Sequence, residues 1–150
     1  MIKIAITGSL ASGKSTASKI LATSKGPLFS ADKIVSDLYK NEKFRRYLSV
    51  KLKIKNPLNI KSKLKNKIAT NKSTITKLEN IIHPLVRKEM IKFEKKYKNK
   101  KFIFFEIPLL VEGKLMKNFD IIFFIKAKKS IRLSRFKLRG GDRGLFSTLN

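Results

Sequence analysis

Residues 8–15 read Gly-Ser-Leu-Ala-Ser-Gly-Lys-Ser and match the pattern G-x-x-x-x-G-K-[ST] in full. The apolar, β-branched segment Ile2–Ile6 stands directly before the match and predicts a buried strand. A helix is predicted from about Lys14 to Ser24, with a stop signal in Lys25-Gly26-Pro27. A strand, a glycine turn and a helix in this order are the context in which the pattern binds phosphate. The motif therefore favours an α/β chain with its first strand inside a sheet.

The residue types of the loop have separate chemical tasks. Gly8 and Gly13 let the backbone turn tightly, so that consecutive N–H groups and the helix N-terminus face phosphate oxygens. Lys14 is expected to reach the terminal phosphates, and the Ser15 hydroxyl is expected to ligate Mg²⁺. The plain alternative is a glycine-containing turn with a solvent-facing lysine. The predicted phosphate-binding residues are Gly8, Ala11, Ser12, Gly13, Lys14, Ser15 and Thr16.

The rest of the chain alternates between short apolar strands and amphipathic helices. Further strands are predicted at Leu28–Phe29, at residues 101–105 and at Ile121–Ile125, and the last two read as buried. A basic helix is predicted over about Lys129–Arg139, where Gly140-Gly141 ends the pattern. Continuously apolar strands that alternate with helices favour a parallel sheet covered by helices on both faces. We therefore expect a three-layer α/β fold.

A helical segment from about 40 to 98 interrupts this alternation. Pro57 separates two predicted helical pieces around Phe44–Leu48 and Ile60–Ile68. Apolar residues at helical spacing from Val86 onward predict a longer helix that Pro84 begins, near its first turn. The segment reads as one continuous insertion, since it contains neither a repeat nor a Gly/Ser-rich linker.

Two acidic residues follow predicted strands, where ligands of parallel sheets bind. Glu106 ends an apolar strand and can hold or orient Mg²⁺ beside the phosphate loop, or can merely cap the next loop. Asp32 stands at the mouth of a helix and can accept a proton from an attacking hydroxyl. An Asp just before a helix is also a common N-cap residue, so both the catalytic and the capping role stay open for Asp32.

The charge balance makes anionic partners the default expectation. The chain carries 36 Lys and Arg against 10 Asp and Glu, for a net charge of +26, and it has no Cys. Scattered, solvated lysines account for much of such a charge without any function. No apolar run approaches the roughly 20 residues that span a bilayer, and no signal peptide begins the chain, so we expect a cytoplasmic protein without a membrane partner.

Several segments together resemble the dephospho-CoA kinase family, in that family's order and spacing. The phosphate loop is common to many nucleotide-binding families, whereas the His-Pro-Leu-Val and acid-x-Pro-Leu-Leu-x-Glu segments are much more specific. The resemblance covers nearly the whole chain. The matching segments besides residues 8–15 are Ser30-Ala31-Asp32, residues 82–87, residues 106–112 and residues 131–135.

The resemblance implies the P-loop NTPase fold, Mg²⁺, and transfer of the ATP γ-phosphoryl group to the ribose 3′-hydroxyl of dephospho-CoA. It implies that Asp32 is the general base and that Lys14 stabilises the phosphates. Arginines of the predicted helix at 129–139, namely Arg132, Arg135 and Arg139, are expected to close over the phosphates, and Arg139 is assigned to ATP. Residues implied for the acceptor pocket are Asp32, His83, Arg87, Glu106, Pro108 and Leu109, and His83 is interpreted as structural support there.

The chain departs from the family's pattern at three points. Ser30 stands where the family usually has Asp, and Glu106 stands where Asp is more common. The sequence also ends at Asn150, within the lid that we place at about 129–150 and before the family's last strand and helix. We therefore expect a single domain over 1–150 in which the strand Ile121–Ile125 lies at a sheet edge.

Two other functions remain open from the residues alone. A nucleic-acid-binding NTPase could use the stretch from Lys43 to Leu78, which has no acidic residue. Only Phe44 and Tyr47 occur there as aromatic residues, and their helical core spacing argues against stacking platforms for bases. Another small-molecule kinase of the same fold, for a nucleoside or nucleotide, is the second alternative. Sequence leaves the oligomeric state unassigned.

Overall fold

A computed structural model describes residues 1–71, 73–108, 110 and 115–149. The chain forms two compact units. The first joins Met1–Ala31 to Phe93–Asn150, and the second is Asp32–Lys92. Among the described residues, no helix is both long and apolar enough to cross a bilayer.

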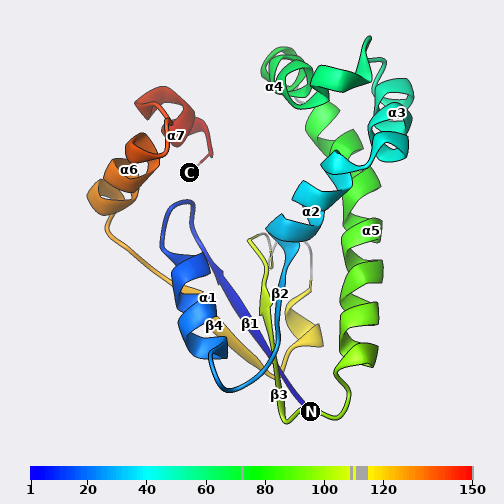
Figure 1. Ribbon diagram of the computed structural model, residues 1–150. Coiled ribbons are helices and arrows are strands. Elements are labelled where there is room, and N and C mark those ends of the chain that lie inside the picture. Colours follow the sequence, from blue (N-terminus) through cyan, green and yellow to red (C-terminus); the bar gives the residue numbers. More distant parts are fainter. Residues whose placement is uncertain (72, 109, 111–114, 150) are drawn as a thin grey trace. The chain divides into compact units, whose positions relative to one another are not determined.

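A four-stranded parallel sheet organises the first unit (Figure 1). Its strands are β1 (Ile2–Gly8), β2 (Leu28–Ser30), β3 (Phe102–Glu106) and β4 (Ile121–Ile125), in the order β2-β3-β1-β4. The register places Ile6 of β1 and Ser30 of β2 opposite Glu106 of β3. The phosphate loop and the strand-end carboxylate therefore both lie at the carboxyl ends of the parallel strands.

Apolar side chains cover both faces of this sheet, as the sequence predicts. On one face, Ile4, Ile6 and Phe104 pack with Ala22 of α1 (Lys14–Ala22). On the other, the ring of Phe105 lies 5.5 Å from that of Phe93, near the end of α5, and 5.2 Å from that of Phe119. Edge-to-face aromatic pairs at these distances stabilise the fold beyond the contribution of the apolar area that they bury. The three-layer α/β arrangement is confirmed.

Strand β4 is an edge strand, and its burial differs from our prediction. Of the strands that the structure describes, it pairs only with β1, as expected for an edge position. The prediction of a buried strand was wrong, because Ile121, Phe123 and Phe124 are 41%, 40% and 52% exposed. An apolar run specifies a strand, but its burial depends on neighbours on both sides.

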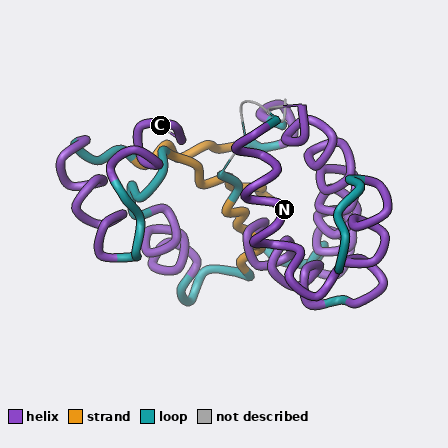
Figure 2. Tube along the Cα trace, turned by 90° about the horizontal axis from the view of Figure 1, so that it is seen from above, coloured by secondary structure: helices purple, strands orange, loops and turns teal. Residues whose placement is uncertain are grey.

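The second unit is built of helices, drawn in purple in Figure 2. Its helices are α2 (Ala31–Lys40), α3 (Glu42–Lys51), the short 3₁₀ turn η1 (Pro57–Asn59), α4 (Ile60–Thr70) and most of α5 (Ser73–Lys96). Asn41 caps α3 by accepting a 3.2 Å hydrogen bond from Phe44 N–H. The core includes the fully buried Leu48 and Ile60, so both predicted helical pieces bury their apolar face.

Helix α5 begins 11 residues before the proline that we expected near its first turn. It starts at Ser73, and Pro84 lies inside it. A proline inside a helix removes one backbone hydrogen bond, yet it does not always end the helix when packing continues on both sides. Ile82 and Met90 are buried on either side of Pro84, which accounts for the continuous helix.

The C-terminal part of the first unit holds two helices and a short 3₁₀ turn, η2 (Met116–Asn118). Helix α6 (Lys129–Leu138) agrees with the prediction to within one residue, and Arg139 is its C-cap. Helix α7 (Arg143–Leu149) was not predicted. It is held by Phe146, which is 1% exposed and lies 5.7 Å from the ring of Phe136.

Candidate functional site

The backbone of residues 8–13 follows a path that its two glycines allow. A Cβ atom on Gly8 would lie 2.3 Å from the backbone oxygen of Ile125, so no side chain fits between the loop and β4. Gly13 adopts a left-handed conformation with φ 98° at the start of α1. Glycine carries no steric cost there. The tight turn expected from the motif is therefore present.

The loop presents donors without matching protein acceptors. Helix α1 has no acidic residue in its first turn and no side-chain cap at its N-terminus. The hydroxyl of Ser12 is buried and has no hydrogen-bond partner among the described residues. A buried hydroxyl without a partner is rare, and helix N-termini attract anions. Phosphate oxygens are the acceptors that suit both features.

The Ser15 hydroxyl donates a 2.5 Å hydrogen bond to Oε1 of Glu106. Glu106 is 4% exposed and ends β3, whereas Ser15 is the second residue of α1. A buried carboxylate is costly unless hydrogen bonds or a cation compensate for its lost hydration. Within the described ranges, the Ser15 hydroxyl is the only hydrogen-bond partner of the Glu106 carboxylate, which leaves room for a cation.

These two side chains fit a magnesium ion. Mg²⁺ prefers oxygen ligands and is commonly bound by one or two protein groups together with phosphates and waters. Ser15 and Glu106 supply a hydroxyl and a carboxylate at one point of the loop. In the part of the chain that the structure describes, no group of three or more His, Cys, Asp or Glu side chains could hold a metal by itself. The donor set therefore suits a metal that arrives with phosphates.

Two of the three arginines expected above the phosphates contact the loop. Nη1 of Arg135 donates to the backbone oxygen of Ser12 at 3.2 Å, and Nη1 of Arg132 lies 3.5 Å from that of Leu10. The Arg132 guanidinium also lies over the ring of Phe146, 5.6 Å from its centroid. Arg139 is exposed at the end of α6, and its contact with ATP stays a prediction.

The residues expected at the acceptor are divided between the two units. Asp32 lies in the first turn of α2, and His83 and Arg87 are four residues apart on α5 and so share one helix face. These three belong to the second unit, and their approach to the phosphate loop stays a prediction. In the first unit, the backbone oxygen of Pro108 accepts a 3.1 Å hydrogen bond from the Thr7 hydroxyl. Leu109 lies outside the described residues.

Sequence reasoning did not distinguish the arginines of α6. Arg132, Arg135 and Arg139 are spaced at three and four residues, so all three lie on one face of a helix. Which of them contacts the loop depends on how α6 is placed. Helix α7 contributes to this placement, because Phe146 packs against Phe136 and Arg132 of α6. The apolar pair Leu145-Phe146 is the signal in the sequence that could have indicated this packing.

Comparison with known families gives one clear match. The family model described as dephospho-CoA kinase matches residues 2–143. A curated protein named dephospho-CoA kinase, from Rickettsia bellii (strain RML369-C), is 37% identical over 139 residues, which are 93% of this chain and 72% of the relative. A second, from Fusobacterium nucleatum, is 36% identical and covers 88% of this chain and 70% of its own length.

Solved structures agree on the fold. The crystal structure of TT1252 from Thermus thermophilus has a TM-score of 0.80 at 25% identity, covering 99% of this chain and 78% of that one. A dephospho-CoA kinase from Campylobacter jejuni has a TM-score of 0.55 at 23% identity, over 92% of this chain and 95% of that one. Both structures therefore share the fold of the sheet and its helices with this chain.

Proposed function

The chain belongs to the dephospho-CoA kinase family, and on that basis we propose that it transfers the γ-phosphoryl group of ATP to the ribose 3′-hydroxyl of dephospho-CoA. The observation that carries the proposal is the hydrogen bond between Ser15 and Glu106, because it joins the phosphate loop to a strand-end carboxylate. This pairing of a hydroxyl and a carboxylate beside a phosphate loop is typical of phosphoryl transfer.

At phosphorus, the transfer forms one bond and breaks one, and a proton moves from the acceptor hydroxyl to the protein. The acceptor's 3′-oxygen bonds to the γ-phosphorus, the bond from that phosphorus to the β,γ-bridging oxygen breaks, and ADP leaves. The hydroxyl proton passes to the carboxylate of Asp32, which acts as general base. Asp32 is exposed in the first turn of α2, where a substrate hydroxyl has access to it.

The chain's cations stabilise the charge that spreads over the phosphate oxygens. Lys14 is half-buried, and it forms no ion pair with any described residue. Its ammonium group therefore serves the phosphates, together with the N–H groups of the loop and the N-terminus of α1. Arg132 and Arg135, already at the loop backbone, add two guanidinium groups, and Arg139 is the third candidate.

Ser15 and Glu106 would hold Mg²⁺, which neutralises phosphate charge when it is bound. For the acceptor, Arg87 supplies a cation, His83 supports the pocket, and Pro108 and Leu109 supply apolar contact. Because ATP is available in the cytoplasm, we place the reaction there.

An ADP-release assay with ATP and Mg²⁺ tests the proposal. Dephospho-CoA, adenosine and a nucleoside monophosphate are compared as acceptors. We expect turnover with dephospho-CoA above the other two, and its loss in Lys14→Ala. Lys19→Ala is the matched control, since Lys19 is an exposed lysine on the same helix. Equal turnover with a nucleoside monophosphate would favour the other kinase function that the sequence left open.

A thermal shift separates folding from activity. ATP with Mg²⁺ should raise the melting temperature of the wild-type chain, because a ligand that binds only the native state stabilises it. Stabilisation without turnover on dephospho-CoA would refute the proposed reaction while leaving the nucleotide site intact. Absence of both would refute the nucleotide site itself.

A further inference from the structure

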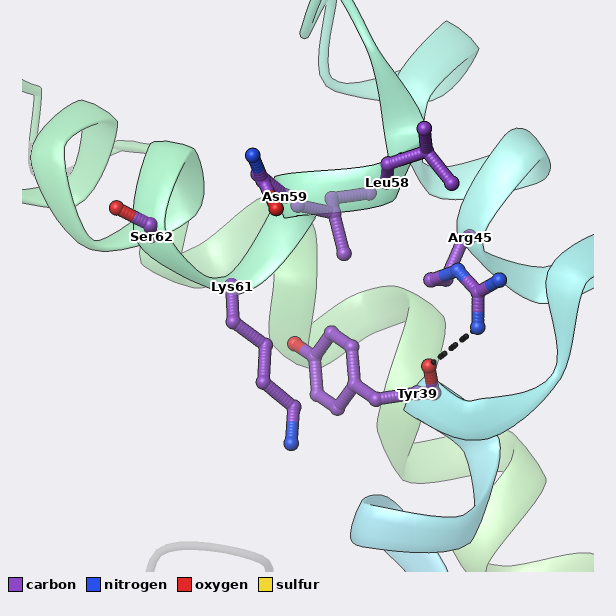
Figure 3. Close-up of a pocket in the computed structure, with 7 residues that line it drawn as sticks. Tyr39, Arg45, Leu58, Asn59, Lys61 and Ser62 are labelled. Carbon is purple, nitrogen blue, oxygen red and sulfur yellow. Dashed lines mark hydrogen bonds between the residues drawn. The ribbon is translucent and has the colours of Figure 1, made fainter.

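A pocket of about 290 Å³ lies in the second unit, between the end of α2, α3, and the start of α4 (Figure 3). It is separate from every residue assigned above. Its lining combines two cationic side chains, one aromatic ring and polar and apolar groups. The lining residues are Tyr39, Arg45, Leu58, Asn59, Ile60, Lys61 and Ser62.

Both cations of the pocket are held by protein contacts. Nη1 of Arg45 donates to the backbone oxygens of Tyr39 at 3.1 Å and Lys40 at 2.7 Å, at the C-terminal end of α2. Toward the residues that the structure describes, Arg45 donates through this one nitrogen, so its Nε and Nη2 groups remain available as donors. Nζ of Lys61 lies over the Tyr39 ring, 5.2 Å from its centroid, as Figure 3 illustrates.

The remaining lining suits an anion that carries an apolar group. None of the seven lining residues is acidic, so the two positive charges are not neutralised within the pocket. Leu58 is 76% exposed, whereas Ile60, two residues later, is 1% exposed and belongs to the core. An exposed leucine at the rim of a cationic pocket offers contact to an alkyl chain.

The pocket lies along α2 from the predicted general base. Asp32 and Tyr39 are seven residues apart on this helix, which is nearly two full turns. They therefore lie on one face, about 10 Å apart along the axis. In dephospho-CoA, the diphosphate is attached to the same ribose as the accepting hydroxyl, and an amide-containing alkyl arm continues beyond it. An acceptor lying along this face reaches from Asp32 to the pocket.

We propose that Arg45 and Lys61 bind the diphosphate of the acceptor, and that Leu58 contacts its alkyl arm. This inference rests on the proposed function, because it takes the acceptor to be dephospho-CoA. It assigns recognition of the acceptor's phosphates to the end of α2 and the start of α4. The phosphate loop binds only the phosphates of ATP.

Steady-state kinetics provide the first test. Lys61→Gln removes one charge of the pocket and should raise KM for dephospho-CoA about tenfold, as expected for the loss of one charge-assisted contact. The kcat and the KM for ATP should not change. Lys51→Gln is the matched control, because Lys51 also lies over a tyrosine, with Nζ 5.8 Å from the Tyr47 ring, and does not line the pocket. Equal KM values for the two variants would overturn the proposal.

Amide NMR of the ¹⁵N-labelled chain tests binding without turnover. Dephospho-CoA should shift the amide signals of residues 39, 45 and 58–62 in the wild type, and much less in Lys61→Gln. Adenosine, which lacks the diphosphate, should leave them unchanged. Shifts with inorganic diphosphate but none with dephospho-CoA would mean that the pocket takes a free anion, and would overturn the assignment to the acceptor.

The two experiments also separate this inference from the proposed function. A wild-type chain that is inactive on dephospho-CoA, yet has pocket shifts with it, contradicts the reaction and supports the pocket. A wild-type chain that is active but has no pocket shifts supports the reaction and overturns the pocket.

Discussion

The Ser15 hydroxyl donates to the Glu106 carboxylate at 2.5 Å, across 91 residues of sequence. The contact exists because β1 and β3 are adjacent and in register, with Ile6 opposite Glu106. Ser15 enters from the helix that follows β1, and Glu106 enters from the end of β3. A hydroxyl and a carboxylate that were predicted separately as magnesium ligands are thus brought into direct contact.

Ser15→Ala removes the hydroxyl and leaves the buried carboxylate without its partner. We expect catalytic efficiency to fall by about 10- to 100-fold, in the range for loss of a group that supports a metal. The apparent affinity for Mg²⁺ should fall with it. Titration of activity against Mg²⁺ concentration measures both effects. Ser15→Thr keeps a hydroxyl and should stay close to the wild type, and equal loss in the two variants would contradict the assignment.

Gly8→Ala should destabilise the chain, because its Cβ would lie 2.3 Å from the backbone oxygen of Ile125. Strand β4 would have to shift, at a cost of about 1–3 kcal/mol in the free energy of unfolding. Chemical denaturation measures this cost. Gly140→Asn is the control, since Gly140 has nothing within 4 Å of an added Cβ and its φ of +82° is one that Asn tolerates.

Asp32→Asn should lower kcat by about 10²- to 10⁴-fold, the usual contribution of a general base. Binding of ATP should be unaffected, as judged by the thermal shift. Asp37→Asn on the same helix is the matched control, because the exposed Asp37 carboxylate is paired with Lys40 at 2.7 Å. Retention of kcat in Asp32→Asn would leave the residue as a helix-terminal carboxylate only.

Arg135→Gln should raise KM for ATP more than Arg139→Gln does. Nη1 of Arg135 is already 3.2 Å from the backbone oxygen of Ser12, whereas Arg139 stands at the exposed end of α6. We expect about a tenfold effect for Arg135, equivalent to one charge-assisted hydrogen bond. The reverse order in the two KM values would assign ATP contact to Arg139.

Tyr39 makes stability depend on pH in the alkaline range. Burial raises the pKa of its phenol above the ordinary value of 10.0, so the unfolded chain loses this proton at a lower pH than the native chain. The contribution is fully present below pH 10 and is lost as pH rises through the native pKa. Melting temperatures from pH 9 to pH 11 should therefore fall more steeply in the wild type than in Tyr39→Phe. Parallel curves would contradict this.

Much of the fold followed from local patterns. The match at residues 8–15, the strand before it and the helix after it depend on residue types a few positions apart. Helical spacing likewise located α3, α4 and α6. Propensity and spacing act over one or two turns, which is why these elements could be predicted. The predicted start of α5 near Pro84 was wrong, because packing around Ile82 and Met90 outweighs the tendency of a proline to begin or end a helix.

Tertiary structure alone decided which of these parts meet. Strand register brings Glu106 to Ser15, and the placement of α6 brings Arg135 rather than Arg139 to the loop. The pairing of Arg45 and Lys61 around Tyr39 depends in the same way on how α2, α3 and α4 pack. Such contacts join residues far apart in the chain, and no local period encodes them. The sequence by itself determined the chemistry of the phosphate loop and the order of strands and helices along the chain. Tertiary packing determined which side chains contact that loop.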